Sequence, residues 1–201
     1  MAVHRYHPLF IKKGSIPMPY RLIRSDRKTI AIEIKNGELL VRAPKRASRE
    51  QIDRFVADHK AWIETHLAKA RAQQQAASEQ PKLMPEDLGR LAEKARIVIP
   101  QRVAHYAPLV GVTYGKITVR SQRTRWGSCS SKGDLSFNCL LLLAPPPVLD
   151  SVVVHELCHR KEMNHSGRFY EEVLREFPEY RQWNRWLKEN GPLLMAMLPE
   201  K

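Results

Sequence analysis

The sequence predicts an α+β fold, and three observations carry that prediction. Short apolar segments between residues 20 and 41 are joined by Asn36-Gly37, which is the strongest short signal for a β-hairpin. Apolar residues at helical spacing follow over residues 49–72 and 85–106. The segment His155-Glu156-Leu157-Cys158-His159 then places two histidines on one face of a further helix.

The first part of the chain combines a small sheet with one long helix. We expect the sheet to be antiparallel, with strands at residues 20–24, 30–34 and 39–41. Ser48 and Gln51 form a capping box, so a helix begins at residue 49 and reaches about residue 72. Residues 73–81 are polar and low in complexity, which is typical of a linker or a frayed helix end.

The second part alternates helices with two short strands. We expect a helix over residues 85–106 that Pro100 bends, and a strand over residues 117–120. A loop at 123–130 leads to an apolar strand over Leu135 to Leu143. The remaining helices begin after the three prolines at 145–147, at Ser166 or Gly167, and at Pro178, the last one ending near Asn190-Gly191.

Charge divides the chain unevenly. The net charge is +13, and residues 1–75 hold 16 Lys and Arg against 7 Asp and Glu. We therefore expect residues 1–80 to form a basic N-terminal β-hairpin and helix segment packed on a catalytic core at residues 81–201. The basic half could attract a nucleotide, a nucleic acid or an acidic partner, but a solvated surface is the favoured explanation, because no basic motif interleaved with aromatic residues is present.

Cysteine usage and hydropathy indicate a compartment. The three cysteines have no paired spacing, which is typical of proteins in a reducing environment. No run of 18 apolar residues is present, and the first residues lack the apolar core of a signal peptide. We expect a soluble cytoplasmic protein without a membrane partner.

The histidine segment predicts a metal site. His155 and His159 can reach one Zn²⁺ per chain, and Glu156 between them is placed to take a proton from a zinc-bound water. A catalytic zinc keeps three protein ligands and one open position. His165 can be the third ligand if the helix ends and the chain turns back, for which Met163-Asn164 is a plausible place.

Other residues are weaker candidates for substrate binding. Arg123 and Arg125 could bind a carboxylate, a phosphate or a developing oxyanion, or could pair with structural acidic groups. Tyr170 could donate to the tetrahedral intermediate or only pack. The strand from Ser136 to Leu140, which includes Asn138, could pair along its edge with an extended peptide. Cys158 is expected to fill the core and not to bind zinc.

The motifs together resemble a known family. Arg125-Trp126-Gly127-Ser128-Cys129, the segment 152–159, Asn164-His165-Ser166 with Phe169, and Pro178-Glu179-Tyr180 are similar to those of the YgjP-like metallopeptidases, which are minimal zincins related to the SprT-like and WLM proteases. The resemblance covers about residues 90–190. It implies a zincin-like core of the minigluzincin type, with zinc on His155, His159 and His165 and with Glu156 as the general base.

The resemblance leaves three functions open. The first is a zinc-dependent peptidase that cleaves peptide or protein substrates. The second is hydrolysis of a nucleotide pyrophosphate, especially of UTP, although no phosphate-binding glycine-rich loop is present. The third is a SprT-like nucleic-acid-associated protease or a zinc-structured binding module. Arg160 departs from the family, in which an apolar residue is expected after the second histidine.

Overall fold

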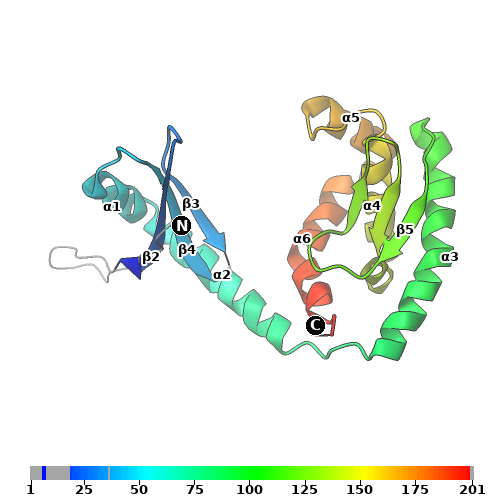
Figure 1. The fold of residues 1–201 in the computed structure, drawn as a ribbon, viewed down its shortest axis with the longest axis horizontal. Coiled ribbons are helices and arrows are strands. Elements are labelled where there is room, and N and C mark those ends of the chain that lie inside the picture. The colour runs from blue at the N-terminus through cyan, green and yellow to red at the C-terminus, as the bar shows by residue number, and fades with distance from the viewer. Residues whose placement is uncertain (1–5, 8–18, 36, 200–201) are drawn as a thin grey trace. The chain divides into compact units, whose positions relative to one another are not determined.

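The structure is a computed structural model that describes residues 6–7, 19–35 and 37–199. The chain divides into two compact units, Met1–Ser78 and Glu79–Lys201, and each combines strands with helices (Figure 1). The predicted α+β class is therefore confirmed. Packing of the first segment on the core stays a prediction.

A four-stranded sheet organises the first unit. Its strands are β1 (Tyr6–His7), β2 (Tyr20–Ser25), β3 (Ala31–Lys35) and β4 (Glu38–Pro44), in the order β1-β2-β4-β3. The predicted hairpin joins β3 to β4, with Gly37 at φ 71°, while Asn36 lies outside the described residues. The prediction of a fully antiparallel sheet was wrong, because β2 pairs with β4 in parallel. The hairpin occupies one edge of β4, so β2 takes the other edge.

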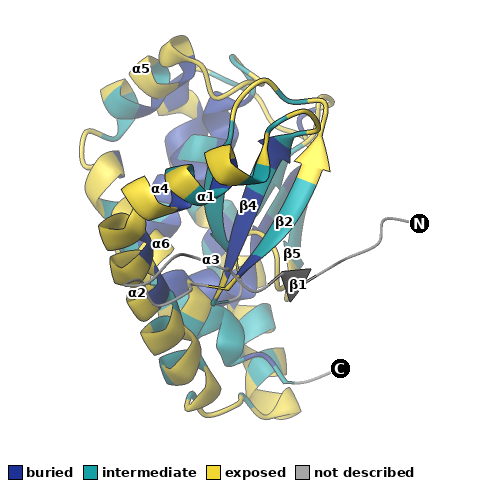
Figure 2. Ribbon diagram, turned by 90° about the vertical axis from the view of Figure 1, so that its left-hand side faces the viewer, coloured by how far each residue is buried: buried dark blue, intermediate teal, exposed yellow. Residues whose placement is uncertain are grey.

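Two helices cover this sheet. Helix α1 (Arg49–Asp58) begins at the predicted capping box, in which the Ser48 side chain accepts from the backbone N–H of Gln51. The chain leaves the helical conformation at His59, and α2 (Lys60–Ser78) then continues through the glutamines and alanines that were predicted to be a linker or a frayed helix end. Those residues are good helix formers. Strand β4 is buried over most of its length (Figure 2) and contributes to a core with Tyr20, Leu39, Val41, Ala43, Ile52, Val56, Ile63 and Leu67.

The second unit has four long helices, a three-stranded sheet and a 3₁₀ turn. They are α3 (Pro85–Val110), β5 (Ile117–Arg120), β6 (Gly127–Cys129), β7 (Leu135–Asn138), η1 (Cys139–Leu143), α4 (Pro146–Cys158), α5 (Gly167–Glu176) and α6 (Tyr180–Ala196). Helix α3 passes through Pro100 and Pro108 without ending. Helix α6 passes through Gly191, where the sequence predicted an end. The Trp126 indole lies close to this position, 3.0 Å from where a Cβ would be, which accounts for the glycine.

Strand β7 is the central strand of the second sheet. It pairs in parallel with β5 and antiparallel with β6, so both of its edges are occupied. The prediction that a peptide pairs along this strand was therefore wrong. The strand is also shorter than predicted: the Asn138 side chain accepts from the backbone N–H of Leu140 and starts the 3₁₀ turn at Cys139.

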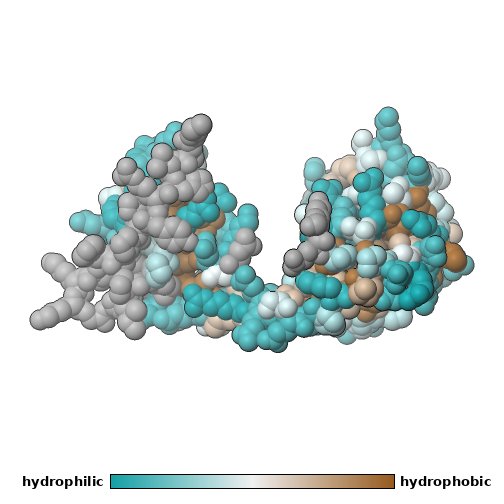
Figure 3. All heavy atoms as spheres, turned by 60° about the horizontal axis from the view of Figure 1, so that its bottom comes forward, coloured by the Kyte–Doolittle hydropathy of each residue, from teal (hydrophilic) through white to brown (hydrophobic). Residues whose placement is uncertain are grey.

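Helix α4 is the centre of the second core. Val153, Val154 and Leu157 are fully buried, and α4 packs against α3, α5, α6 and the sheet. Figure 3 shows hydrophilic and apolar side chains together on the surface. Ile97 and Leu109 on α3 are among the exposed large apolar residues. Within the described residues, no helix is both long and apolar enough to span a membrane.

An ion pair fastens α4 to α3. Arg102 Nε and Nη2 donate to the two carboxylate oxygens of Asp150 at 2.6 and 2.9 Å, and the Asp150 side chain is only 14% exposed.

We expect Arg102→Met to lower the free energy of unfolding by about 1–3 kcal/mol, because a mostly buried carboxylate loses its partner. Urea unfolding followed by circular dichroism measures the change. Arg90→Met, which removes the exposed pair with Asp87, is the matched control and should cost less than about 1 kcal/mol. Equal losses in the two variants would contradict the assignment.

Candidate metal centre

The end of helix α4 presents the first two histidines. His155 lies in the last turn, and His159 is the C-terminal cap, with φ −62° and ψ −15°. The helix therefore ends before Met163-Asn164, the turn expected from the sequence. The backbone N–H groups of Lys161 and Glu162 both donate to the Cys158 carbonyl, which turns the chain back toward the helix. Ser166 then caps α5, so His165 lies between two ordered elements.

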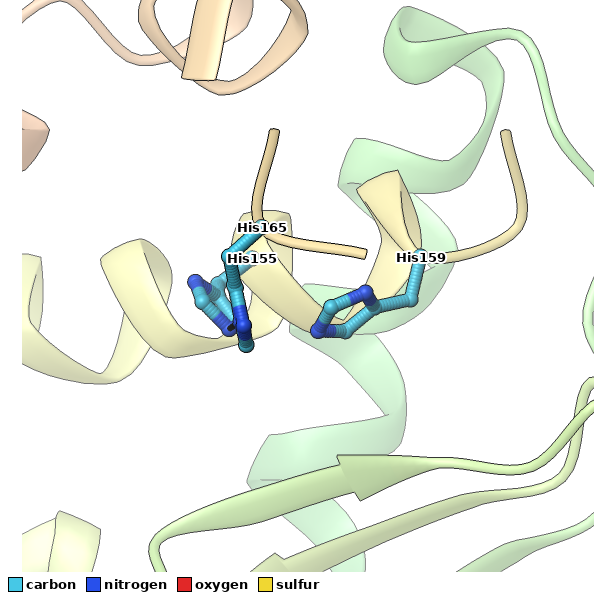
Figure 4. Close-up of side chains that lie close together, drawn as sticks. All are labelled: His155, His159 and His165. Carbon is cyan, nitrogen blue, oxygen red and sulfur yellow. Dashed lines mark hydrogen bonds between the residues drawn. The ribbon is translucent and has the colours of Figure 1, made fainter. Parts of the chain in front are cut away.

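The three imidazoles converge (Figure 4). The ring centroids of His155, His159 and His165 are 4.8–4.9 Å apart, and one ligand atom from each lies within 4.8 Å of the others. The Nε2 atoms of His155 and His165 are 3.0 Å apart. The structure therefore brings together the three residues that the sequence selected.

The Nδ1 atoms of His155 and His159 contact other groups of the protein. His155 Nδ1 lies 2.8 Å from the Tyr180 hydroxyl, and His159 Nδ1 lies 3.1 Å from the Glu162 carbonyl oxygen. A carbonyl only accepts, so His159 Nδ1 carries the proton and its Nε2 lone pair is free for a metal. The centroid of the buried Phe169 ring lies 4.6–4.9 Å from the centroids of all three imidazoles, so this ring packs against each of them.

The electrostatics of this cluster suit a bound cation. Burial, followed by the nearby His159 and His165, lowers the pKa of His155 to about 3. Burial likewise lowers the pKa of His159. His155 and His159 are therefore held in the neutral form that binds metals, and the 3.0 Å contact between the Nε2 atoms of His155 and His165 brings two potential ligand atoms together. Three neutral imidazoles fit a divalent metal, and zinc is the ion that such sets commonly hold.

Glu156 is buried beside the cluster at 5% exposure. Burial raises the pKa of its carboxyl to about 8, while the positive charge of Arg125 acts in the opposite direction. A cation held by the histidines would lower this pKa further toward the ionised form. Strand β6 lies against the carboxylate: a Cβ on Gly127 would be 2.5 Å from Glu156 Oε1. The absence of a side chain at Gly127 therefore makes room for Glu156.

Cys158 lies outside the cluster. Its side chain is fully buried in the hydrophobic core, and burial raises the pKa of the thiol to about 12. The described residues contain one cluster of potential metal ligands, and it holds only the three histidines. Cys158 is thus placed as the sequence suggested, in the core.

Two of the candidate substrate residues have structural partners. The Arg123 guanidinium donates to the carbonyl oxygens of Leu198 and Pro199 near the C-terminus. Asn138 is fully buried, and its amide nitrogen donates to the carbonyls of Gln122 and Arg125. The proposed contact of these two side chains with substrate has no support in this geometry; both hold the loop before β6.

The other two candidates lie at the site. Arg125 is exposed and close enough for its charge to act on Glu156. Tyr170 is 39% exposed, and its ring centroid lies 6.2 Å from that of His165, with an angle of 28° between the two ring planes. Both remain candidates for substrate contact.

Sequence reasoning missed three supporting residues. Gly127, Phe169 and Tyr180 were noted as parts of motifs, but no role was given to them. Gly127 in β6 contacts Glu156, Phe169 in α5 contacts the histidine rings, and Tyr180 in α6 contacts His155. Gly127 and Tyr180 lie far from α4 in the sequence. A buried tyrosine after a metal helix is a useful signal, because metal-bound histidines usually need a hydrogen-bond partner.

The Tyr180 hydroxyl provides a direct test of this arrangement. We expect Tyr180→Phe to weaken metal binding about 10- to 100-fold, because His155 loses the group that orients its ring. Competition with a chromogenic chelator measures the affinity. Tyr114→Phe, which changes an exposed tyrosine, serves as control. Unchanged affinity in Tyr180→Phe would show that the ring needs no such support.

Comparisons with known proteins give one family match. The YgjP-like metallopeptidase domain matches residues 28–90 and 79–190, which lie in both units. No curated protein matches the chain significantly.

Two solved structures are similar to a little under half of the chain. The zymogen of the metallopeptidase abylysin from Pyrococcus abyssi has 22% identity and a TM-score of 0.42, and the match covers 46% of this chain and 94% of that one. The zymogen of jannalysin from Methanocaldococcus jannaschii has 19% identity and a TM-score of 0.41, with 46% and 95% covered.

Proposed function

The chain belongs to the YgjP-like metallopeptidase family, and from this premise we propose that it is a peptidase with one Zn²⁺ held by His155, His159 and His165. The observation that supports the proposal most is the convergence of three imidazole nitrogens beside the buried carboxylate of Glu156. Three protein ligands leave a fourth position for water or substrate, as catalytic zinc sites require.

The proposed reaction is hydrolysis of a peptide bond. Zinc, when bound, supplies a Lewis acid that polarises the scissile carbonyl and lowers the pKa of water. Glu156 is the general base: its carboxylate accepts a proton from the attacking water and returns it to the nitrogen of the leaving amine. The Arg125 guanidinium, whose charge already acts on Glu156, is the candidate donor to the oxyanion that develops on the carbonyl.

Strand β6 replaces β7 as the proposed docking edge for the peptide. Hydrogen bonds from Asn138 N–H to the Trp126 carbonyl and from Ser130 N–H to the Asp134 carbonyl fix which groups of β6 face β7. By the antiparallel pattern, the N–H and C=O groups of Gly127 and Cys129 point away from β7. The described part of the chain provides no partner for them. An extended peptide paired there would lie next to Glu156.

The other proposals are less specific. The three cysteines are free, which suits the reducing cytoplasm that we propose as the location. Neither UTP hydrolysis nor nucleic-acid binding gains a supporting contact from the described residues. We therefore treat both as outcomes of the experiment below.

Metal analysis and a substrate comparison test the function. We expect about one zinc per chain in the purified protein, cleavage of unfolded protein detected by mass spectrometry, and loss of cleavage after chelation with recovery on adding zinc. The same preparations are assayed for pyrophosphate release from UTP and for DNA binding at low salt. Release of pyrophosphate without peptide cleavage would replace the peptidase proposal.

A further inference from the structure

A groove lies between helices α5 and α6. Its volume is about 550 Å³, and its walls include Tyr170 and Glu171 from α5 and Tyr180, Arg181, Asn184 and Lys188 from α6. Arg181, Asn184 and Lys188 are spaced three and four residues apart, so they lie along one face of α6. The groove therefore has one aromatic end and one polar, basic wall.

The aromatic end of the groove adjoins the metal centre. Tyr180 touches the cluster through its hydroxyl, 2.8 Å from His155 Nδ1. The Tyr170 ring lies 6.2 Å from that of His165 and 6.3 Å from that of Tyr180. A peptide whose scissile bond lies at the histidines therefore has a neighbouring residue within reach of the groove.

The charges of the groove are not neutralised by ion pairs. In the described part of the chain, neither Arg181 nor Lys188 forms an ion pair, and both are exposed. By contrast, Lys161 and Arg175 around α5 pair with Glu172, and Arg175 also pairs with Glu176.

One acidic residue, Glu171, also lines the groove and leaves it with one net positive charge. An arginine offers a planar fork of donors for a carboxylate, and a lysine adds a point charge. The Asn184 amide is a further donor. The groove is thus suited to an anionic group carried on a short apolar stem, which the tyrosine rings can contact.

We propose that this groove is a specificity subsite that binds a carboxylate of the peptide, either an Asp or Glu side chain near the scissile bond or the C-terminal carboxylate. The inference rests on the proposed peptidase function and names its preferred substrates. Arg181 and Lys188 are the residues that determine the preference, and Glu171 limits its strength.

Binding to an inactive variant tests the subsite without turnover. Fluorescence anisotropy of zinc-loaded Glu156→Gln measures affinity for labelled peptides that contain Glu, for matched peptides with Gln, and for both with free or amidated C-termini. We expect the carboxylate to improve affinity about tenfold at low salt, and less at high salt. Loss of the preference on amidation alone identifies the C-terminal carboxylate as the ligand; loss on Glu-to-Gln exchange alone identifies the side chain.

Charge reversal in the groove sharpens the test. Arg181→Glu combined with Lys188→Glu, in the same background, should abolish the preference and favour a Lys-containing peptide, whereas Glu171→Gln should strengthen the original one. Arg185→Gln removes an exposed charge of α6 outside the groove and should change nothing. Circular dichroism confirms that each variant is folded.

The outcomes separate this inference from the proposed function. Equal affinity for charged and neutral peptides, or a preference that survives charge reversal, would overturn the subsite. A carboxylate preference in the binding assay, together with no peptide cleavage by the native protein, would retain the subsite and contradict the peptidase proposal.

Discussion

Replacement of Glu156 by Gln is expected to lower peptide turnover by about 10²- to 10⁴-fold while leaving the metal content unchanged. Gln keeps the shape of Glu, so the buried position beside β6 stays filled. It cannot accept a proton from water, which removes the proposed general base. The three imidazoles are expected to be unaffected, because in the described part of the chain their nitrogens bond to the Tyr180 hydroxyl, the Glu162 carbonyl and each other.

Turnover and metal content must be measured on the same preparation. Mass spectrometry of peptide products gives the rate, and elemental analysis gives the zinc per chain. Glu93→Gln makes the same chemical change at an exposed position of α3 and should retain full activity. Undiminished turnover in Glu156→Gln with zinc bound would refute the role of Glu156; loss of zinc would instead assign Glu156 to the metal site.

The metal site was predictable because its geometry is mostly local. Two histidines four residues apart on a helix share one face whatever the rest of the fold does. His165 required a turn of the chain, which the sequence placed at Met163-Asn164. The turn begins earlier, at His159, and still brings His165 to the other two rings. To predict that His165 joins the other two histidines, it was therefore enough that the helix ends within a few residues of His159; the exact end was not needed.

Arg160 shows why the helix end was harder to predict. Its guanidinium donates to the carbonyls of Thr113 and Ser131, in the loops before β5 and before β7. Gly133, at φ 92°, lets the Arg160 side chain lie against the turn, since a Cβ there would be 2.8 Å from it. The departure from the family pattern thus has a structural role that depends on two distant loops. No local pattern could have indicated it.

Sheet pairing was the weakest part of the prediction for the same reason. Alternating apolar residues locate strands, but they do not say which strands become neighbours. The parallel pairing of β2 with β4 and the central position of β7 both depend on long-range packing. The error in β7 had a functional consequence, because it moved the proposed peptide edge to β6.

Gly127 in strand β6 makes room for the carboxylate of Glu156, so the backbone at this position directly affects the proposed general base. We expect Gly127→Ala to lower kcat/KM about 10²-fold or more, because a Cβ would lie 2.5 Å from Oε1 and 2.7 Å from Cγ of Glu156. Both atoms belong to the proposed general base, so either the carboxylate or strand β6 must shift. Metal content should be unchanged, because no hydrogen bond joins Gly127 to the three histidine rings in the described part of the chain.

The comparison with Gly89→Ala separates this effect from a general glycine effect. Gly89 lies in α3 with no atom within 4 Å of a new Cβ, so alanine there should leave activity intact and raise stability by about 0.5–1 kcal/mol. In the Gly127→Ala background, Glu156→Asp should cost less activity than it does alone, because the shorter side chain relieves the contact. Strictly additive losses in kcat/KM would mean that Gly127 acts on catalysis by another route than the position of Glu156.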